Sequence, residues 1–419
     1  MAASDTFIPL SMAVLTVSDT RDLANDTSGQ YLVDTLSEVG HQLSDRQITK
    51  DDIYQIRAVL SRWIADEKVN AVLITGGTGF TGSVLLRKLV ENKLKVKAIA
   101  RPSSDISRFA GMDIEWIRGD VYDPAVVEQA TKDVEYIFHV AAAFREAKIG
   151  DDIYRKVHVD STKLLAQAAL KQPNFKRFLH TSTMGVHGHI EEPPADEEYR
   201  FSPGDVYQKT KVEGELWIRD FSAQKGLPLT VVRPAAIYGP GDRRLLKIFK
   251  MAAAGWFPLI GSRNTLYHLI HVEDLAEFYL FCATEPKALN DYFLCGNRTH
   301  VELKQFVNYI AELYGTKVRF VPIPAGPLFV LGDICEFVCK KIGIEPPIYR
   351  RRIAFFTKDR SLNTAKIHEH LGFKTKFDNE AGIKQTASWY LENKWVTLSS
   401  GNKKVQAEHP SAMTSSANG

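Results

Sequence analysis

The feature that most constrains the fold is a glycine-rich turn set between an apolar run and a helical pattern. The apolar run 71–74 predicts a buried strand, and a helix-periodic pattern begins at Ser83. Between them stand three glycines at a spacing of three: Gly76, Gly79 and Gly82. The first permits a tight turn, the second lets backbone N–H groups approach phosphate oxygens, and the third lets helix and strand pack closely. With Phe80 and Thr81 in the same turn, the stretch predicts a pyrophosphate-binding strand–turn–helix unit.

Composition places the chain among globular proteins with more than one domain. It has 419 residues, with 44% hydrophobic and 25% charged residues. The net charge of +3 is too small to favour nucleic acid or an anionic membrane as partner. Of the four cysteines, Cys335 and Cys339 lie four apart in an apolar helical pattern, which predicts buried thiols and no metal site. The first eleven residues lack a signal-peptide pattern, so we expect a cytoplasmic protein.

Two strands and two helices are predicted before the glycine turn. The apolar run 12–17 predicts a strand, and a helix follows with Thr27 or Ser28 as its cap. A weaker strand is expected over 41–48, and a second helix precedes the run at 71–74. This alternation predicts an α/β extension at the N-terminus.

The strand after the turn indicates which dinucleotide is bound. It covers 95–100 and ends at Arg101, where an acidic residue would bind the ribose 2′-hydroxyl of NAD. A guanidinium there suits a 2′-phosphate, which favours NADP(H), with NAD as the alternative and a solvated surface arginine as the plainer interpretation. The next strand ends at Asp120 and Val121, and this carboxylate could accept a hydrogen bond from the adenine amino group.

Further alternation of strands and helices extends the same pattern. A strand over 135–143 ends in Ala141 and Ala142, whose small side chains leave room for a cofactor at the sheet edge. A helix over 159–169 and a strand over 177–183 follow. We therefore predict a Rossmann-type, doubly wound parallel sheet with helices on both faces.

Three side chains beyond this sheet suggest proton-transfer chemistry. Thr183 ends the fifth predicted strand, and Tyr207 and Lys211 lie four apart on one helix face. The ammonium and a positive nicotinamide ring would lower the tyrosine pKa, so that the phenol could act as general acid or base on a secondary alcohol or ketone. Each residue alone is common by chance, and only their order behind a glycine-rich turn favours catalysis.

Residues 71–397 resemble the extended short-chain dehydrogenase/reductases, also called the NAD-dependent epimerase/dehydratase family. The resemblance rests on the motifs already described and on three more: His139-Val-Ala-Ala142, Arg233-Pro234-Ala-Ala-Ile-Tyr-Gly-Pro-Gly-Asp242 and His271-Val-Glu-Asp274. It implies that Tyr207 transfers a proton, that Lys211 also holds the cofactor ribose, and that Thr183 positions the substrate oxygen. It also implies that Pro234 lies at the cofactor. The family's usual asparagine is replaced by His158.

Substrate class is narrowed by motifs that are missing. Thr183 is followed by Met184 and Gly185 instead of the two acids of sugar-nucleotide dehydratases, and 267–269 lacks the arginine that epimerases place on a diphosphate. The stretch beginning at Arg101 looks more like the dihydroflavonol-reductase and 3β-hydroxysteroid-dehydrogenase branch, which also includes the hopanoid-associated sugar epimerases of bacteria. We expect an oxidoreductase that acts on an apolar or mixed small molecule. The alternatives are a nucleotide-sugar epimerase and a non-catalytic nucleotide-binding scaffold.

Residues 7–79 resemble the first half of molybdenum-cofactor biosynthesis protein B and its molybdopterin-binding relatives. The motifs are Ala13-Val-Leu-Thr-Val-Ser-Asp19, Asp26-Thr-Ser-Gly29 and Val72-Leu-Ile-Thr-Gly-Gly-Thr-Gly79. The acidic residue that follows the glycine turn in that family is absent. The resemblance therefore implies a truncated pterin module. It could have arisen by natural fusion, by recombination or by an assembly error. Its role could be in molybdenum-cofactor biosynthesis or could be purely structural.

The expected organisation is a pterin-like module at 1–70, a dinucleotide-binding domain at 71–300, a substrate lobe at 301–397 and a disordered tail at 398–419. Parts of 185–205 and 240–270 should join the lobe. The apolar pattern over 327–342 contains two acids, which excludes a bilayer span and favours a lid helix over a membrane-surface helix. A homodimer is expected from the family resemblance alone.

Overall fold

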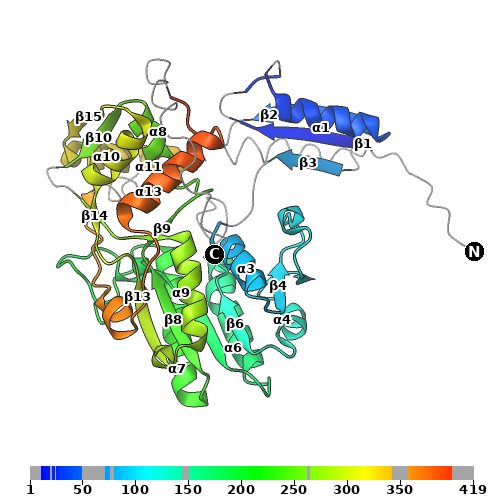
Figure 1. Ribbon diagram of the computed structural model, residues 1–419, viewed down its shortest axis with the longest axis vertical. Coiled ribbons are helices and arrows are strands. Elements are labelled where there is room, and N and C mark those ends of the chain that lie inside the picture. Colours follow the sequence, from blue (N-terminus) through cyan, green and yellow to red (C-terminus); the bar gives the residue numbers. More distant parts are fainter. Residues whose placement is uncertain are drawn as a thin grey trace, which may run out of the picture. The chain divides into compact units, whose positions relative to one another are not determined.

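The computed structural model describes residues 11–18, 21–23, 25–49, 71–75, 80–143, 151–261, 265–341 and 357–398. The chain divides into two compact units, Met1–Thr78 and Gly79–Gly419, here called the N-terminal and C-terminal units. Figure 1 shows the elements of each. The second helix predicted for the N-terminal unit and the predicted tail beyond residue 398 lie outside the described residues.

The N-terminal unit contains a parallel sheet in the order β2-β1-β3 with helix α1. Its elements are β1 Ser11–Val17, α1 Thr27–Glu38, β2 Gln42–Thr49 and β3 Ala71–Thr75. The N-cap of α1 is Asp26, so the prediction of Thr27 or Ser28 as the cap was wrong. The Asp26 carboxylate is buried and accepts the Gly29 N–H at 2.9 Å. Its other oxygen accepts from the Thr16 hydroxyl at 2.8 Å, which fixes the start of the helix against β1.

The strand before the glycine turn pairs inside the N-terminal unit. β3 runs parallel to β1, with Met12 opposite Ala71 and Thr16 opposite Thr75. The sequence predicted this strand correctly, but placed it at the start of the dinucleotide-binding domain. The central side chains of β1 are apolar and fully buried, and its backbone N–H and C=O groups pair with β3. No periodicity within 71–82 could reveal this pairing.

The C-terminal unit contains several groups of parallel strands, two of which precede the predicted cofactor residues. One has the order β13-β8-β7-β6, the other pairs β4 with β5, and no strand among the described residues joins them. Their bounds are β4 Val96–Ala100, β5 Ile114–Arg118, β6 Tyr136–His139, β7 Arg177–Thr181, β8 Leu229–Pro234 and β13 Asp291–Cys295. Strand β8 is buried along its whole length, as expected for a parallel strand covered on both faces.

Helices cover both faces of the four-stranded group (Figure 1). Their bounds are α3 Phe80–Glu91, α4 Pro124–Thr131, α5 Asp151–Arg155, α6 Ser161–Ala169, α7 Val206–Lys225 and α9 Val272–Thr284. Leu179 of β7 packs with α3 and α9 in one apolar core, whereas its neighbour Phe178 packs with α4, α6 and α7 in another. The side chains alternate between faces, which gives the layered arrangement of a doubly wound fold.

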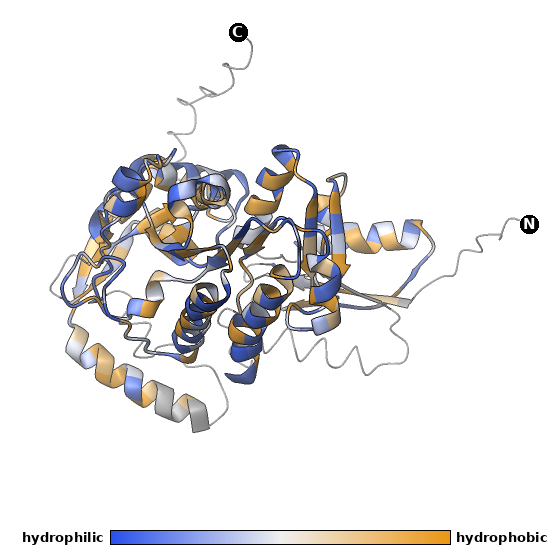
Figure 2. Cartoon of the chain, turned by 90° about the horizontal axis from the view of Figure 1, so that it is seen from below, coloured by the Kyte–Doolittle hydropathy of each residue, from blue (hydrophilic) through white to orange (hydrophobic). Residues whose placement is uncertain are grey.

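The rest of the C-terminal unit forms a smaller lobe with its own core. Its elements are β9 Ala236–Tyr238, α8 Leu246–Ala253, β10 Trp256–Ile260, β11 Leu266–Tyr267, β12 Leu269–His271, β14 Val301–Glu302, α10 Leu303–Tyr314, β15 Arg319–Ile323, α11 Ala325–Lys341 and α13 Asn379–Glu392. Apolar faces of α8, α10 and α13 meet in this core. Figure 2 shows that helices of the chain carry both hydrophobic and hydrophilic residues.

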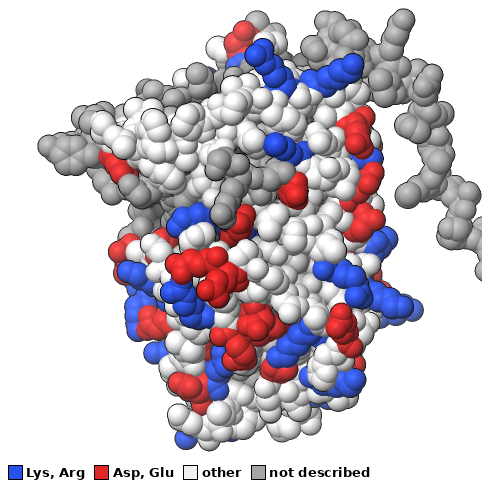
Figure 3. Space-filling model, turned by 90° about the vertical axis from the view of Figure 1, so that its left-hand side faces the viewer, with Lys and Arg blue, Asp and Glu red and all other residues white. Residues whose placement is uncertain are grey.

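Helix α11 lies where the apolar pattern over 327–342 predicts a helix. Cys339 is buried and Cys335 is partly exposed, with their sulfurs 3.9 Å apart. Among the described residues, none of the helices combines the length and apolar character that a bilayer span needs. On the face shown in Figure 3, acidic and basic side chains are interleaved over the lower half, in keeping with the small net charge.

Candidate active site

Helix α7 carries two of the predicted catalytic residues. Its N-cap is Asp205, whose carboxylate accepts the Gln208 N–H at 2.8 Å, so that Tyr207 lies in the first turn. The ring of Tyr207 is partly exposed. One turn further, Lys211 is 3% exposed, and its Nζ donates to the Thr181 carbonyl at 3.0 Å. This bond ties the catalytic turn of α7 to the carboxyl end of β7.

Thr183 follows β7 and lies beside the same turn of α7. Its hydroxyl accepts the Gly185 N–H at 3.1 Å and caps a short 3₁₀ helix. A methyl group added to Gly185 would come within 3.3 Å of Gln208 Nε2 and 3.4 Å of Thr183 Oγ1. The structure therefore brings Thr183 close to Gln208 at the start of α7. Gln208 is the residue that follows Tyr207 in the sequence.

Burial controls the charge of Lys211. Loss of solvent lowers the pKa of its ammonium from 10.5 to about 8, while the nearby Glu215 carboxylate acts in the opposite direction. Glu215 itself is buried and paired with Arg233, whose Nε donates to Glu215 Oε1 at 3.0 Å. Lys211 is thus a poorly solvated cation whose charge is directed toward the site.

His158 takes the place of the family's asparagine and is 1% exposed. It lies in a π-helical turn, Lys156–Asp160, that leads into α6. One ring nitrogen accepts the Ala143 N–H at 3.1 Å, and the other lies 2.8 Å from Thr210 Oγ1. The imidazole packs edge-on against Tyr207, with the ring centroids 5.2 Å apart.

The described part of the predicted phosphate-binding turn begins at Phe80. Phe80, Thr81 and Gly82 open α3, whereas Gly76 and Gly79 lie outside the described residues. A methyl group on Gly82 would meet the Val140 side chain at 3.9 Å, an ordinary contact. The N-terminus of α3 therefore lies near the carboxyl end of β6, which is where a helix can present N–H groups to a pyrophosphate.

Arg101 and Asp120 follow the paired strands β4 and β5. Arg101 is exposed, and the loop that begins there is held by Arg118, whose Nη2 donates to the Pro102 carbonyl at 2.7 Å and the Ser104 carbonyl at 3.0 Å. Asp120 is partly buried and raises the pKa of the Tyr122 phenol, second to burial. The two predicted cofactor residues thus share one edge of this strand pair.

The remaining predicted cofactor residues follow other strands at their carboxyl ends. Val121 is partly buried after β5, Ala141 is partly buried and Ala142 exposed after β6, and Pro234 is buried at the end of β8. Carboxyl ends of parallel strands meet at one edge of a sheet, which is where α/β proteins bind nucleotides. The donor set and the small side chains fit a nicotinamide dinucleotide.

The sequence did not reveal a set of buried polar residues beneath Lys211. His139 of β6 and His180 of β7 are paired in register, with ring centroids 5.7 Å apart. His139 Nε2 contacts Thr162 Oγ1 at 3.0 Å, and within the described part of the chain neither ring nitrogen of His180 has a hydrogen-bonding partner. Thr210 was also missed, although its position between Tyr207 and Lys211 on one helical turn was a signal.

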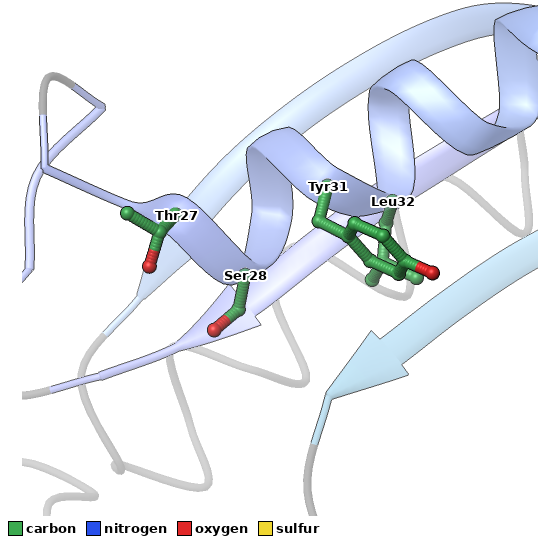
Figure 4. Close-up of a pocket in the computed structure, with 4 residues that line it drawn as sticks. All are labelled: Thr27, Ser28, Tyr31 and Leu32. Atoms are coloured by element: carbon green, nitrogen blue, oxygen red, sulfur yellow. The ribbon is translucent and has the colours of Figure 1, made fainter.

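A separate pocket lies in the N-terminal unit. It is lined by Thr27, Ser28, Tyr31 and Leu32 of α1, whose side chains project from one stretch of the helix (Figure 4). The Ser28 hydroxyl accepts from Arg21 Nη1 at 2.6 Å. None of the predicted catalytic residues lines this pocket.

The C-terminal unit is similar to a known protein family. Residues 72–296, more than half of the chain, match the family described as NAD dependent epimerase/dehydratase. The chain belongs to this family. It is an enzyme of the nicotinamide-dependent dehydrogenase and epimerase class, as the resemblance in the sequence predicted.

Relatives within this family differ in the substrates that their names imply. The chain is 27% identical over 350 residues to a decarboxylating sterol-4-alpha-carboxylate 3-dehydrogenase of Candida albicans, covering 78% of this chain and 99% of that protein. It is 25% identical over 339 residues to a ceramide reductase of Caulobacter vibrioides, covering 80% and 98%. A UDP-glucose 4-epimerase structure from Thermotoga maritima superposes with a TM-score of 0.60 at 22% identity, covering 76% and 98%, which confirms the Rossmann-type fold.

The N-terminal resemblance is confirmed as well. Residues 13–103 match a family described as probable molybdopterin binding domain. The match runs past residue 79, where we expected the resemblance to end, and overlaps the epimerase/dehydratase match over 72–103. The glycine turn therefore belongs to both sequence patterns.

Proposed function

We propose that the protein is an NADP(H)-dependent oxidoreductase that acts at a secondary alcohol or ketone of an apolar or mixed small molecule. The observation that carries this proposal is the arrangement on α7. Lys211 is a buried ammonium anchored to the end of β7, one helical turn from the partly exposed ring of Tyr207. This arrangement suits proton transfer at a carbonyl oxygen.

In this proposal Tyr207 moves the proton and two neighbours support it. A buried positive charge favours the phenolate over the phenol, because the negative form gains more from the field than the neutral form. Lys211 supplies this field, and the Thr183 hydroxyl donates a hydrogen bond to the substrate oxygen. A bound nicotinamide supplies or accepts the hydride. The side chains of this chain hold the oxygen and move its proton.

The preference for NADP(H) rests on Arg101. Its guanidinium is exposed after β4, on a loop whose backbone is held by Arg118. A planar guanidinium can pair with two oxygens of a 2′-phosphate, whereas NAD offers only a ribose hydroxyl at that point. We assign Phe80, Thr81 and Gly82 to the pyrophosphate, and Asp120, Val121, Ala141, Ala142 and Pro234 to the rest of the cofactor.

An apolar substrate is favoured by the lack of an arginine in one stretch of the sequence and by two of the relatives. The stretch Tyr267–Leu269 contains no arginine, and Tyr267 and Leu269 are buried in the core of the C-terminal lobe. The sterol dehydrogenase and the ceramide reductase are named for lipid substrates. A nucleotide-sugar epimerase is the second candidate, since a UDP-glucose 4-epimerase shares the fold.

The experiment is a screen of the purified chain against both substrate classes. NADPH and NADH are each offered with steroid, flavonoid and long-chain ketones, and absorbance at the nicotinamide band is followed; UDP-sugars are analysed separately for interconversion. We expect ketone-dependent oxidation of NADPH, faster than that of NADH. Interconversion of UDP-sugars without ketone reduction would replace this proposal with the epimerase.

A further inference from the structure

His158 touches three parts of the proposed site at once. Nε2 accepts the N–H of Ala143, in the segment after β6 that we assign to the cofactor. Nδ1 contacts the hydroxyl of Thr210, which lies between Tyr207 and Lys211 on α7. The third contact is with Tyr207, whose ring packs edge-on against the imidazole at an interplanar angle of 86°.

The partners of His158 allow one protonation state. The Ala143 N–H can only donate, so Nε2 must be the acceptor and Nδ1 must carry the hydrogen. Thr210 Oγ1 accepts this hydrogen and in turn donates to the Val206 carbonyl at 2.9 Å or the Tyr207 carbonyl at 3.1 Å. The hydrogen bonds therefore run in one direction, from Nδ1–H through a hydroxyl to the helix backbone. A second proton on the ring would face the Ala143 N–H.

The surroundings keep the ring neutral. Burial lowers the pKa of His158 to about 2, and the charges of Lys211 on α7 and His139 on β6 act in the same direction. Tyr154 of α5 lies 6.0 Å from the ring, and Tyr207 lies on the other element packed against it. A carboxylate is absent from this group of neighbours, so no negative charge among them stabilises the imidazolium.

The backbone of His158 is held as firmly as its ring. The Thr162 hydroxyl donates to the His158 carbonyl at 2.8 Å, and Thr162 Oγ1 also contacts His139 at the end of β6. Helix α7 passes so closely that a methyl group on Gly214 would lie 2.5 Å from the His158 carbonyl oxygen. Because the backbone of His158 is held in place, the positions of its ring nitrogens are restricted as well.

We propose that His158 is a positioning residue that joins the Tyr207 turn of α7 to the Ala143 segment, as a neutral imidazole with its hydrogen on Nδ1. The proposal rests on the proposed function for its consequence in catalysis. A displacement of about 1 Å between two reacting groups can lower a rate by about a hundredfold. Loss of the imidazole should therefore act on the chemical step more than on binding.

The test compares His158→Ala, His158→Asn and Thr210→Val, with the exposed His370→Ala as matched control. We expect kcat for ketone reduction to fall about 10- to 100-fold in His158→Ala and Thr210→Val, with KM changed less than about threefold. An asparagine amide can accept from Ala143 and donate to Thr210, so His158→Asn should recover most of the rate. The double variant His158→Ala/Thr210→Val should be no slower than His158→Ala, because the histidine change already removes the contact with Thr210.

The outcome that overturns the proposal is equally specific. Unchanged kcat in folded His158→Ala, an Asn variant as slow as the Ala variant, or multiplicative losses in the double variant would each reject it. Should His158→Ala fail to fold, Thr210→Val provides the same comparison with a smaller change.

A readout without turnover separates this proposal from the proposed function. The ¹⁵N chemical shifts of the His158 imidazole in the full chain distinguish its two neutral tautomers, and amide exchange reports on the Ala143 N–H. We expect the Nδ1–H tautomer and a protected Ala143 amide that exchanges faster in His158→Ala. The Nε2–H tautomer would refute the positioning role, whereas absence of ketone reduction with the expected tautomer would refute only the function.

Discussion

Lys211 carries its charge where water cannot solvate it. Its ammonium is anchored to one carbonyl, and no carboxylate among the described residues contacts it directly, because Glu215 is paired with Arg233. A buried charge of this kind destabilises the fold while it creates the field that a catalytic phenol needs. The residue therefore couples stability to pH in a direction that can be worked out.

Lys211→Met should be more stable relative to the wild type at pH 7 than at pH 9.5. The pKa of Lys211 falls from 10.5 in the unfolded chain to about 8 in the folded one, so between these values the unfolded state binds more protons. Stability of the wild type therefore gains with rising pH in this window, by about 2 kcal/mol from pH 7 to 9.5, and the methionine variant lacks this gain. Urea unfolding of both proteins at the two pH values measures the difference, and a pH-independent difference would contradict it.

The residues of the candidate site were predictable in proportion to how local their signals are. Tyr207 and Lys211 could be predicted from their spacing of four on one helix, and Thr183 from its place after an apolar strand. Thr210 and the ring contacts of His158 depend on partners from other segments of the chain, since Ala143 lies 15 positions and Thr210 52 positions from His158. Sequence periodicity carries no information about such pairs, so they required the folded structure.

At the scale of elements, buried histidines on β6, β7 and the π-helical turn determine the response to acid. Burial lowers the pKa of His139 to about 3 and that of His180 well below its usual 6.5. The unfolded chain binds these protons near pH 6.5 and the folded chain does not. Stability is therefore present above pH 6.5 and is lost as the pH falls below it.

His180→Leu should reduce this sensitivity to acid. The wild type should lose about 2 kcal/mol for each such histidine between pH 7 and pH 5, and the variant should lose about 2 kcal/mol less than the wild type. The free energy of unfolding at several pH values, analysed for the number of protons taken up, is the measurement. An identical proton uptake in both proteins would show that His180 already titrates normally in the fold.

The crossing of α7 over the π-helical turn depends on a glycine. Gly214→Ala would set a methyl group 2.5 Å from the His158 carbonyl oxygen, a backbone atom that cannot move away on its own. We expect a loss of about 1–3 kcal/mol in stability, with reduced turnover because His158 moves. Gly326→Ala in α11 is the control, since nothing lies within 4 Å of its added methyl group and alanine favours helix. Equal melting temperatures for the two variants would argue against a close crossing.

Among the elements, those with clear periodicity were predicted within a few residues. The pattern over 159–169 gave α6, Ser161–Ala169, and the run at 12–17 gave β1, Ser11–Val17. The π-helical turn before α6 was not predicted, because an extra residue in one helical turn leaves the apolar spacing almost unchanged. The cap of α1 was predicted one or two residues too late, at Thr27 or Ser28, because Asp26, Thr27 and Ser28 are all good caps.

At the scale of the whole molecule, the glycine turn connects two units that belong to different families. Its strand, β3, pairs with β1, while its helix, α3, packs in the core of the C-terminal unit. A pyrophosphate turn is formed by strand, turn and helix together. The sequence alone indicated that the two patterns share the glycine turn up to Gly79, but not which sheet the strand would join, because both families place a parallel strand there.

A chain that begins at residue 67 tests what this sharing does to the cofactor site. Without β1, the strand Ala71–Thr75 loses its partner in the N-terminal unit. We expect NADPH to bind about tenfold more tightly, corresponding to about 1.4 kcal/mol. Fluorescence titration of the full and shortened chains measures this, and weaker or equal binding by the shortened chain would mean that the first 66 residues do not compete.

Transfer of deuterium tests the central claim most directly. NADPH carrying deuterium at both C4 positions is incubated with the wild type, Tyr207→Phe and the control Tyr136→Phe, together with the best ketone from the screen. The account predicts one deuterium in the alcohol for each NADPH consumed, a rate lower by about 10²–10⁴ in Tyr207→Phe, and no change in Tyr136→Phe. Alcohol formation that is unaffected in Tyr207→Phe, or no labelled alcohol from any ketone while UDP-glucose and UDP-galactose are interconverted, would contradict it.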